Sequence, residues 1–169
     1  MYNTMKKILS VLVGMIITLN LSACFFIEHI DKNEIRELSD NYIELFVQKN
    51  AYELFNCFCS DIQENRKEDT TREMRQAFDF IDGNIVDYEF NDFGSEEEHR
   101  SDGKIAYFQC NPNYKNVLTD TGKKYTVRFA YCSAYKDHPE YEGLWRITIR
   151  DYDDDNKTLI TVGQFYPPE

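Results

Sequence analysis

The sequence lacks the short motifs that identify the common enzyme classes. It has no glycine-rich loop that would hold a phosphate, and no Gly-x-Ser-x-Gly turn that would present a serine nucleophile. Its three histidines stand in predicted loops or in the segment before the domain, at His29, His99 and His138, and no cysteine is spaced to work with them. Internal repeats are also absent. We therefore predict no catalytic residue and no cofactor.

Positive charge is scarce. Nineteen Lys and Arg residues face thirty Asp and Glu residues, so the net charge is −11. Nucleic acids and anionic lipid headgroups require clustered Lys and Arg, and this balance excludes both as partners. The acidic excess indicates a solvated surface or a mild preference for cationic ligands.

A long hydrophobic run is missing as well. The most apolar stretch, residues 8–21, is shorter than the ~20 residues that cross a bilayer, and four small or polar residues interrupt it: Ser10, Gly14, Thr18 and Asn20. Lys6 and Lys7 precede it, and Leu21, Ser22 and Ala23 end it. This order of a positive region, a short apolar region and a small-residue cleavage site predicts a signal peptide over residues 1–23.

Cys24 follows the cleavage site directly. The sequence Leu-Ser-Ala-Cys resembles the bacterial lipobox, in which the thiol receives diacylglycerol before cleavage. The resemblance implies a lipoprotein held by its lipid on the extracytoplasmic face of the cell membrane, because several buried acyl chains give a firm anchor. The alternative is a plain secreted protein with a cysteine at its cleavage point.

Removal of residues 1–23 leaves 146 residues and shifts the net charge to −13, because the segment contains two lysines and no acid. This length suits one domain with its own core. We expect a lipidated tether over residues 24–31 and a single domain over residues 32–169.

Four cysteines remain in the domain: Cys57, Cys59, Cys110 and Cys132. Outside the cytoplasm they would allow two disulfides. The first two are two residues apart in a predicted helix and point to opposite sides, so at most one bridge to a strand cysteine is geometrically easy. Buried free thiols are the alternative, and zinc is not expected from this spacing.

Aromatic residues make up 15% of the chain, with 12 Tyr and 12 Phe. Most should lie in the core, where each ring buries a large area. A surplus of tyrosine could instead line a binding groove.

Hydrophobic periodicity predicts three helices and then strands. Apolar residues recur at helical spacing over residues 33–49, 51–58 and 70–81, with predicted caps at Asp31, Asn50 and Thr70. The charged segment 61–69 shows no period and predicts a loop.

The period then changes to two, which predicts strands over residues 85–91, 103–110, 124–136, 143–152 and 158–165. The fold class is therefore α+β, with three helices packed on an antiparallel sheet of four to five strands.

This order of elements resembles a family of bacterial lipoproteins of unknown function, found mainly in Gram-positive bacteria and placed among the cystatin-like, nuclear-transport-factor-like cone folds. Three segments carry the resemblance: SDNYIELFVQKNAYELFNCF (residues 39–58), AFDFIDGNIVDYEF (77–90) and EGLWRITIRD (142–151). The resemblance implies a curved sheet wrapped by three helices around a conical pocket, and it supplies no catalytic residues.

Related cone folds include enzymes that place an acidic or histidine base opposite a tyrosine. Tyr42, Tyr107, Tyr131 and Asp151 could converge in this way, and the three tyrosines are candidate pocket or ligand contacts. An apolar pocket would raise the pKa of a carboxyl group and make it a useful base.

Three arginines, Arg128, Arg146 and Arg150, fall on the polar faces of two predicted strands. If these strands are neighbours, the guanidinium groups share a face and could hold a carboxylate or phosphate. The competing interpretation pairs them with local acids such as Glu89 or Asp151.

The acidic run over residues 151–156 superficially resembles a calcium loop. The sixth position is Asn156 and the twelfth is Val162, whereas such a loop needs Gly and Glu there. We interpret the run as a turn between strands, and we predict no metal site.

Three classes of function stay open: a module that binds a small molecule or a protein, an enzyme acting on a small hydrophobic substrate in the pocket, and a subunit of an assembly. A buried carboxylate beside a tyrosine hydroxyl would favour the enzyme, whereas an interior filled by rings would favour the interaction module. An apolar patch on the open sheet face would favour the subunit.

Overall fold

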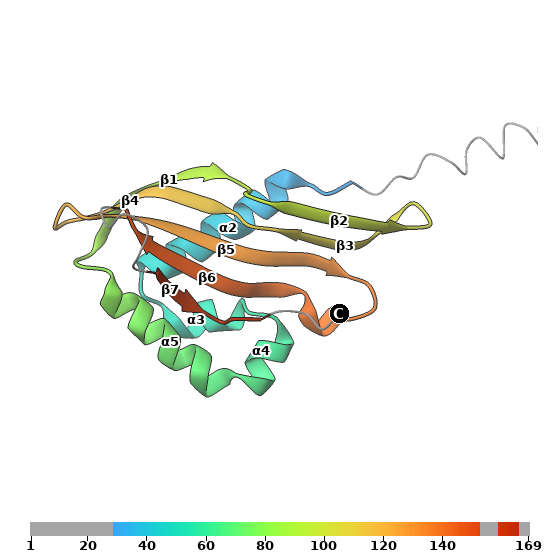
Figure 1. Ribbon diagram of the computed structural model, residues 1–169, viewed down its shortest axis with the longest axis horizontal. Helices are drawn as coiled ribbons and strands as arrows, with labels where there is room; N and C mark the ends of the chain where they lie inside the picture. The colour runs from blue at the N-terminus through green and yellow to red at the C-terminus, as the bar shows by residue number, and fades with distance from the viewer. Residues whose placement is uncertain (1–28, 153–158, 166–169) are drawn as a thin grey trace, which may run out of the picture.

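Helices come first along the chain and strands follow, as Figure 1 shows. The computed structural model describes residues 29–152 and 159–165, so the predicted signal peptide and Cys24 lie outside the described residues. The helices are α2 (Lys32–Val47), α3 (Ala51–Asn56), α4 (Ser60–Asn65) and α5 (Lys67–Phe80). The strands are β1 (Ile85–Asp92), β2 (Glu96–Ser101), β3 (Lys104–Cys110), β4 (Asn113–Thr119), β5 (Lys124–Tyr135), β6 (Gly143–Asp151) and β7 (Leu159–Val162), with a short 3-10 helix η1 (Pro139–Tyr141) before β6. The predicted α+β class is confirmed.

Helix α2 forms because its apolar side chains follow the helical period and its first turn is capped. The Asp31 side chain accepts a hydrogen bond from the Asn33 backbone N–H at 2.8 Å, as expected for an N-cap. Its buried face consists of Ile35, Ser39, Tyr42, Ile43 and Phe46. This face packs on the sheet and fixes the helix along β5.

The predicted loop over residues 61–69 is wrong, and so is the count of three helices. Residues Ser60–Asn65 form α4, and α5 begins at Lys67 rather than at Thr70. A single completely buried residue, Ile62, anchors α4, which is too little apolar pattern for a period to be visible. Thr70 is itself buried within α5.

The sheet is built around β5, its longest strand. One edge of β5 pairs with β4 over its first half and with β3 over its second half, and its other edge pairs with β6. Strands β1 and β2 lie outside β4 and β3, and β7 lies outside β6. Every one of these pairings is antiparallel, and the described sheet has seven strands.

The prediction of four to five strands missed β2 and β4. Every residue of β2 is exposed, so the strand has no buried face to produce alternation. In β4, Asn116 has a φ of 51° and lies where the register with β5 shifts. This irregularity breaks the alternation that would have revealed the strand.

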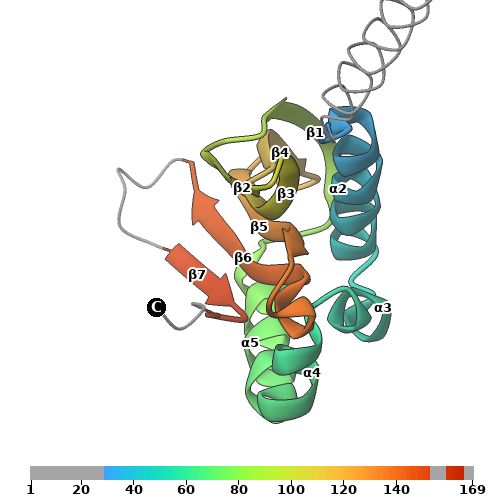
Figure 2. The ribbon, with the colours of Figure 1, turned by 90° about the vertical axis from the view of Figure 1, so that its right-hand side faces the viewer.

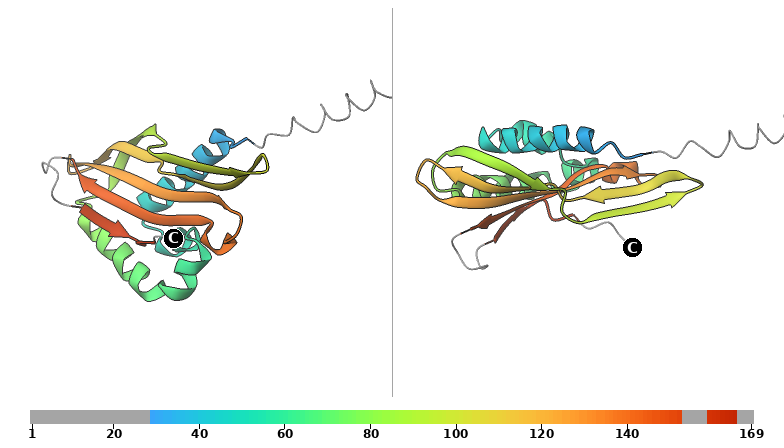
Figure 3. Two further views of the ribbon diagram at one scale, coloured as in Figure 1. Left: turned by 45° about the vertical axis from the view of Figure 1, so that its right-hand side comes forward. Right: turned by 90° about the horizontal axis from the view of Figure 1, so that it is seen from above.

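Helices cover one face of the sheet and leave the other open. Figures 2 and 3 show α2 along one face of the strands, with α5 beside β7 at the lower edge. The space between α2 and the sheet is filled by large rings, among which Tyr42 contacts Phe129 at 5.7 Å between centroids. Among the described residues, no helix is long and apolar enough to cross a membrane.

Candidate functional site

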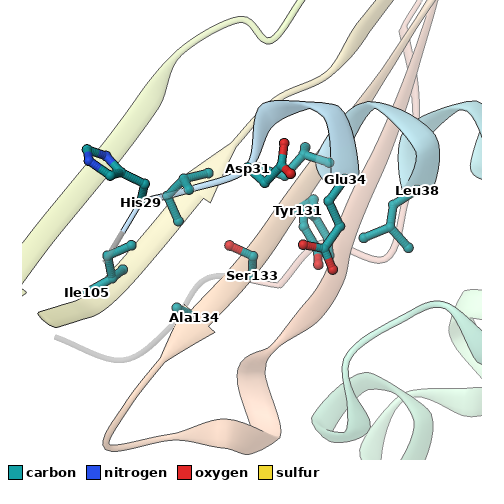
Figure 4. Close-up of a pocket in the computed structure, with 10 residues that line it drawn as sticks. His29, Asp31, Glu34, Leu38, Ile105, Tyr131, Ser133 and Ala134 are labelled. Atoms are coloured by element: carbon teal, nitrogen blue, oxygen red, sulfur yellow. The ribbon is translucent and has the colours of Figure 1, made fainter. Parts of the chain in front are cut away.

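A cavity of about 260 Å³ lies where the first turns of α2 pass over the end of β5 and the start of β3. Figure 4 shows the side chains that line it. They are His29, Ile30, Asp31, Glu34, Ile35, Leu38, Ile105, Tyr131, Ser133 and Ala134. We call this set the N-terminal pocket, because it adjoins the predicted tether.

Apolar side chains from three elements form the walls of the N-terminal pocket. Ile35 and Leu38 come from α2, Ile105 from β3 and Ala134 from β5. Ile35 is buried against Phe108 in a small cluster separate from the main core. The walls can therefore hold the apolar part of a small molecule.

An irregularity in β5 lies at the N-terminal pocket. Cys132 pairs with Gln109 and Ala134 pairs with Phe108, so Ser133 is an extra residue without a partner on β3. Such a bulge turns neighbouring side chains to the same side of the sheet. Ser133 and Ala134 thus both line the pocket, and Tyr131, two residues before Ser133, lies on the same side by ordinary strand alternation.

Ser133 contributes a buried hydroxyl group to this site. Its hydroxyl oxygen is buried and has no hydrogen-bond partner among the described residues. An unpaired buried hydroxyl costs about 1–3 kcal/mol, which a ligand that bonds to it would recover.

The charge of the pocket is negative. Glu34 lies in the first turn of α2 and is exposed, and none of the ion pairs found within residues 29–152 and 159–165 includes it. The nearby Lys32 is instead engaged with Glu96, at 2.8 Å. Burial raises the pKa of Tyr131 to about 12, with smaller contributions from Cys110, Cys132 and Glu34. Tyr131 is therefore neutral at physiological pH and can donate a hydrogen bond.

The four residues that the sequence suggested as an enzyme-like set do not converge. Tyr42 and Tyr131 lie together, with ring centroids 6.1 Å apart, but Tyr42 is buried beneath the pocket, and burial raises its pKa strongly. Tyr107 lies on the opposite face of the sheet, because it alternates with Phe108 and Cys110. Asp151 lies at the far end of β6, 3.8 Å from Lys123.

A carboxylate does lie beside a tyrosine hydroxyl elsewhere, at Asp40 and Tyr114. The Tyr114 hydroxyl donates to Asp40 at 2.6 Å and is 3.0 Å from the Ser39 hydroxyl. Arg36 pairs with the same carboxylate at 2.8 Å and lies over the Phe90 ring. Tyr114 is completely buried and its hydroxyl is fully used, so this network stabilises the fold rather than presenting an acid or base.

The three predicted arginines share the open face of the sheet. Arg128 on β5 is opposite Thr148, so Arg146 and Arg150 on β6 are its two diagonal neighbours. Arg146 and Arg150 already have partners, whereas Glu89, one of the acids considered for them, pairs with Lys115 at 3.4 Å. A role for these arginines in binding stays a prediction.

The four cysteines of the domain are free thiols. Cys57 and Cys59 are not inside one helix as predicted, because they cap the end of α3 and the start of α4. Burial raises the pKa of both Cys110 and Cys132 to about 12. These thiols behave as small apolar residues.

Residues 153–156 of the acidic run lie outside the described residues. Within the part of the chain that the structure describes, no group of three His, Cys, Asp or Glu residues is placed to hold a metal ion.

Sequence reasoning proposed only one residue of the N-terminal pocket, Tyr131, as a site residue, whereas His29 and Asp31 were named in other roles. No periodic signal marks a bulge such as that at Ser133. Glu34 is an exposed acid in the first turn of α2, and nothing in its sequence context places it at a cavity.

Comparison with curated proteins finds no match. A family model described as a domain of unknown function, DUF5104, matches residues 41–158, which is more than half of the chain. The matched segment contains the β3 and β5 walls of the N-terminal pocket, whereas its α2 wall, at residues 29–38, precedes the match. The chain belongs to the DUF5104 family.

Proposed function

We propose that this protein is a lipoprotein anchored through Cys24 to the extracytoplasmic face of the membrane, and that its domain binds a small, positively charged molecule in the N-terminal pocket. The cone fold suggested by the sequence belongs to the same proposal. The observation that carries the binding role is the buried Ser133 hydroxyl, which has no partner among the described residues, in a cavity with apolar walls and two carboxylates, Asp31 and Glu34, in its lining.

The chemistry of the pocket favours a ligand with an apolar body and one cationic head. Ile35, Leu38 and Ile105 provide contacts for the body. Glu34 provides a negative charge, and the neutral Tyr131 phenol provides a hydrogen bond. An anion would meet two carboxylates, Asp31 and Glu34, at the entrance, so charge selects against it.

The position of the pocket supports the proposed anchor. His29 and Ile30 line the pocket and belong to the predicted tether, residues 24–31. A lipid on Cys24 would thus hold the pocket within a few residues of the membrane surface. Molecules that leave or approach the membrane would meet the pocket first.

Three probes that share one cyclohexyl ring and differ in the charge of its substituent test the binding role: cyclohexylammonium, cyclohexanol and cyclohexanecarboxylate. Ligand-observed NMR on the mature chain should rank their affinities in that order. Glu34→Gln should weaken cyclohexylammonium binding by about threefold, because an exposed ion pair contributes about 0.2–1 kcal/mol.

Glu37→Gln is the matched control, since Glu37 lies one helical turn further along α2, is exposed and does not line the pocket. It should leave all three affinities unchanged. Equal binding of the cation and the carboxylate, or an equal effect of both substitutions, would remove the proposed selectivity.

Replacement of the lipidated cysteine tests the anchor. In cells fed an alkyne-labelled fatty acid, the natural chain should carry the label and sediment with membranes. Cys24→Ser should lose both properties, whereas Cys57→Ser should keep them. A labelled Cys24→Ser chain would contradict the proposal.

A further inference from the structure

A cluster of five aromatic rings lies on the side of the sheet that α2 does not cover. Its members come from five segments that are distant in sequence, and we call them the aromatic face: Tyr107 (β3), Tyr135 (β5), Tyr141 (η1), Trp145 (β6) and Phe165 (after β7). The rings contact one another in a chain. Tyr107 and Tyr135 are 5.1 Å apart between centroids, Tyr135 and Tyr141 are 5.4 Å apart, and Tyr141 and Phe165 are 4.9 Å apart.

Trp145 is the centre of this cluster. It lies where the register between β5 and β6 shifts, so its ring joins the open face, together with its neighbour Arg146. Its indole N–H donates to the Tyr141 carbonyl, and its ring contacts those of Tyr107 and Phe165 at 6.4 and 5.4 Å. It is 4% exposed, so the outer rings cover it.

The outer rings themselves are only partly buried. Tyr107, Tyr135, Tyr141 and Phe165 all retain exposed surface. Partly exposed rings that lie next to one another form an apolar patch, and aromatic side chains are enriched at the centres of interfaces. Because the rings pack directly on one another, they present a surface rather than a hollow, which suits a polypeptide better than a small molecule.

Carboxylates surround the aromatic face. Glu142 accepts a hydrogen bond from the Tyr135 backbone N–H at 2.9 Å. After the effect of burial, Glu140 and Asp61 are the groups that most raise the pKa of Tyr141, and Glu97 acts in the same way on Tyr107, so these acids lie close to the rings. Two described cations near the rings are already engaged: Arg146 is half-buried and has a partner, and Arg66 donates to the Gln164 carbonyl at 2.9 Å and pairs with Glu73.

The positions of two histidines indicate that a nitrogen cation fits beside these rings and carboxylates. His138 stacks on Tyr141 at 5.0 Å and is 3.0 Å from a Glu140 oxygen. His99 packs on Tyr107 at 5.6 Å and is 3.0 Å from a Glu97 oxygen. Each imidazole thus lies against both a ring and a carboxylate, the two groups that hold a nitrogen cation. Both imidazoles are exposed, so rotation of their side chains can free these positions.

We infer that the aromatic face binds a basic segment of a partner protein, whose Lys or Arg side chains lie over the tyrosine rings and pair with the surrounding carboxylates. A single cation over an exposed ring contributes about 0.5–1 kcal/mol, so useful affinity requires several such contacts on one chain. This surface is separate from the N-terminal pocket, because its rings lie on the opposite face of the sheet.

The only tryptophan of the chain, Trp145, lies in the cluster and reports binding directly. The mature chain in non-ionic detergent is titrated with an Arg-Ser repeat peptide of eight residues, and with Glu-Ser and Gly-Ser repeats of the same length. The Arg-Ser peptide should change the fluorescence in a saturable way that weakens with added salt. The other two peptides should have no effect.

Two pairs of charge substitutions separate this site from general attraction to an acidic protein. Glu97→Gln with Glu140→Gln should weaken Arg-Ser binding by about tenfold, from two exposed ion pairs of up to about 1 kcal/mol each. Glu64→Gln with Glu68→Gln removes the same charge from exposed positions on α4 and α5, and should change affinity by less than about twofold. Equal losses in both variants would overturn the inference.

Tyr141→Leu tests the role of the rings, because leucine keeps an apolar contact but has no π-face. We expect a loss of about threefold with an unchanged melting temperature. If this variant unfolds, the two double charge variants, Glu97→Gln with Glu140→Gln and Glu64→Gln with Glu68→Gln, still test the inference. Glu34→Gln in the N-terminal pocket should leave peptide binding unchanged, so failure of the proposed pocket and failure of this surface can be told apart.

Discussion

The two faces of the sheet are built from alternate residues of the same strands, yet they differ in burial and packing. On the face under α2, Phe129, Ile147 and Ile149 are completely buried. On the open face, Arg128 and Arg150 are exposed, and the aromatic face occupies the other end of the same strands. The side chains under the middle of α2 are closely packed, whereas the N-terminal pocket lies at the margin of the same helix.

The largest expected difference between the faces is in stability. Phe129→Ala should lower the free energy of unfolding by about 3–5 kcal/mol, because a ring that contacts Tyr42 and Tyr114 is lost from a close-packed core. Thr148→Ala on the open face should change it by about 0.5 kcal/mol or less. Urea unfolding measures both values, and similar losses would show that the open face is also tightly packed.

Each face has one buried thiol whose ionisation at alkaline pH should lower the stability of the fold. These are Cys110 under α2 and Cys132 on the open side. Burial raises the folded-state pKa of each from 9.0 to about 12, so the contribution to stability is complete below pH 9 and is lost as pH rises toward 12. At pH 10 each thiol should reduce the free energy of unfolding by about 1.4 kcal/mol relative to pH 8.

Urea titrations at pH 8 and pH 10 measure this change. The double variant Cys110→Ala, Cys132→Ala should show a smaller decrease than the natural chain. An identical decrease would assign the alkaline sensitivity to the tyrosines instead.

Loss of a single hydroxyl should also distinguish the faces. Tyr114→Phe removes the hydrogen bonds to Asp40 and Ser39 and should cost about 1–3 kcal/mol. Tyr107→Phe removes one longer bond to Gln109, at 3.3 Å on the half-buried open side, and should cost about 0.5 kcal/mol. Thermal unfolding measures the loss of stability in both variants. A larger loss for Tyr107→Phe than for Tyr114→Phe would contradict this prediction.

The smallest effect is expected at the pocket itself. Ser133→Ala removes a buried hydroxyl that has no partner among the described residues, so stability should stay unchanged or rise by up to about 1 kcal/mol. The same substitution should weaken cyclohexylammonium binding by about twofold to fivefold. A clear loss of stability would mean that the hydroxyl is bonded in the folded protein.

Sequence patterns predicted the elements that bury one regular face. The helix over residues 32–47 and strands β1, β3, β5 and β6 were found this way, as were the caps at Asp31 and Asn50. Strand β2 was missed because it buries nothing, and α4 because one residue, Ile62, holds it. Hydrophobic periodicity arises where an element buries one regular face. It therefore does not reveal elements that are wholly exposed or anchored by a single residue.

The candidate sites were predictable only in part. An excess of tyrosine suggested both core and surface roles, and Tyr114 and Tyr107 show one of each. Neither the bulge at Ser133 nor that at Trp145 follows from spacing, because a bulge depends on the partner strand. The residues that these bulges bring together therefore could not be grouped from the sequence.

Methyl NMR of the mature chain during titration with cyclohexylammonium tests the central claim most directly. The account predicts shifts in the methyl signals of Ile35, Leu38 and Ile105 around the N-terminal pocket, and none in those of Ile147 and Ile149 in the packed core. Shifts spread through the core, or confined to residues outside the pocket, would contradict it.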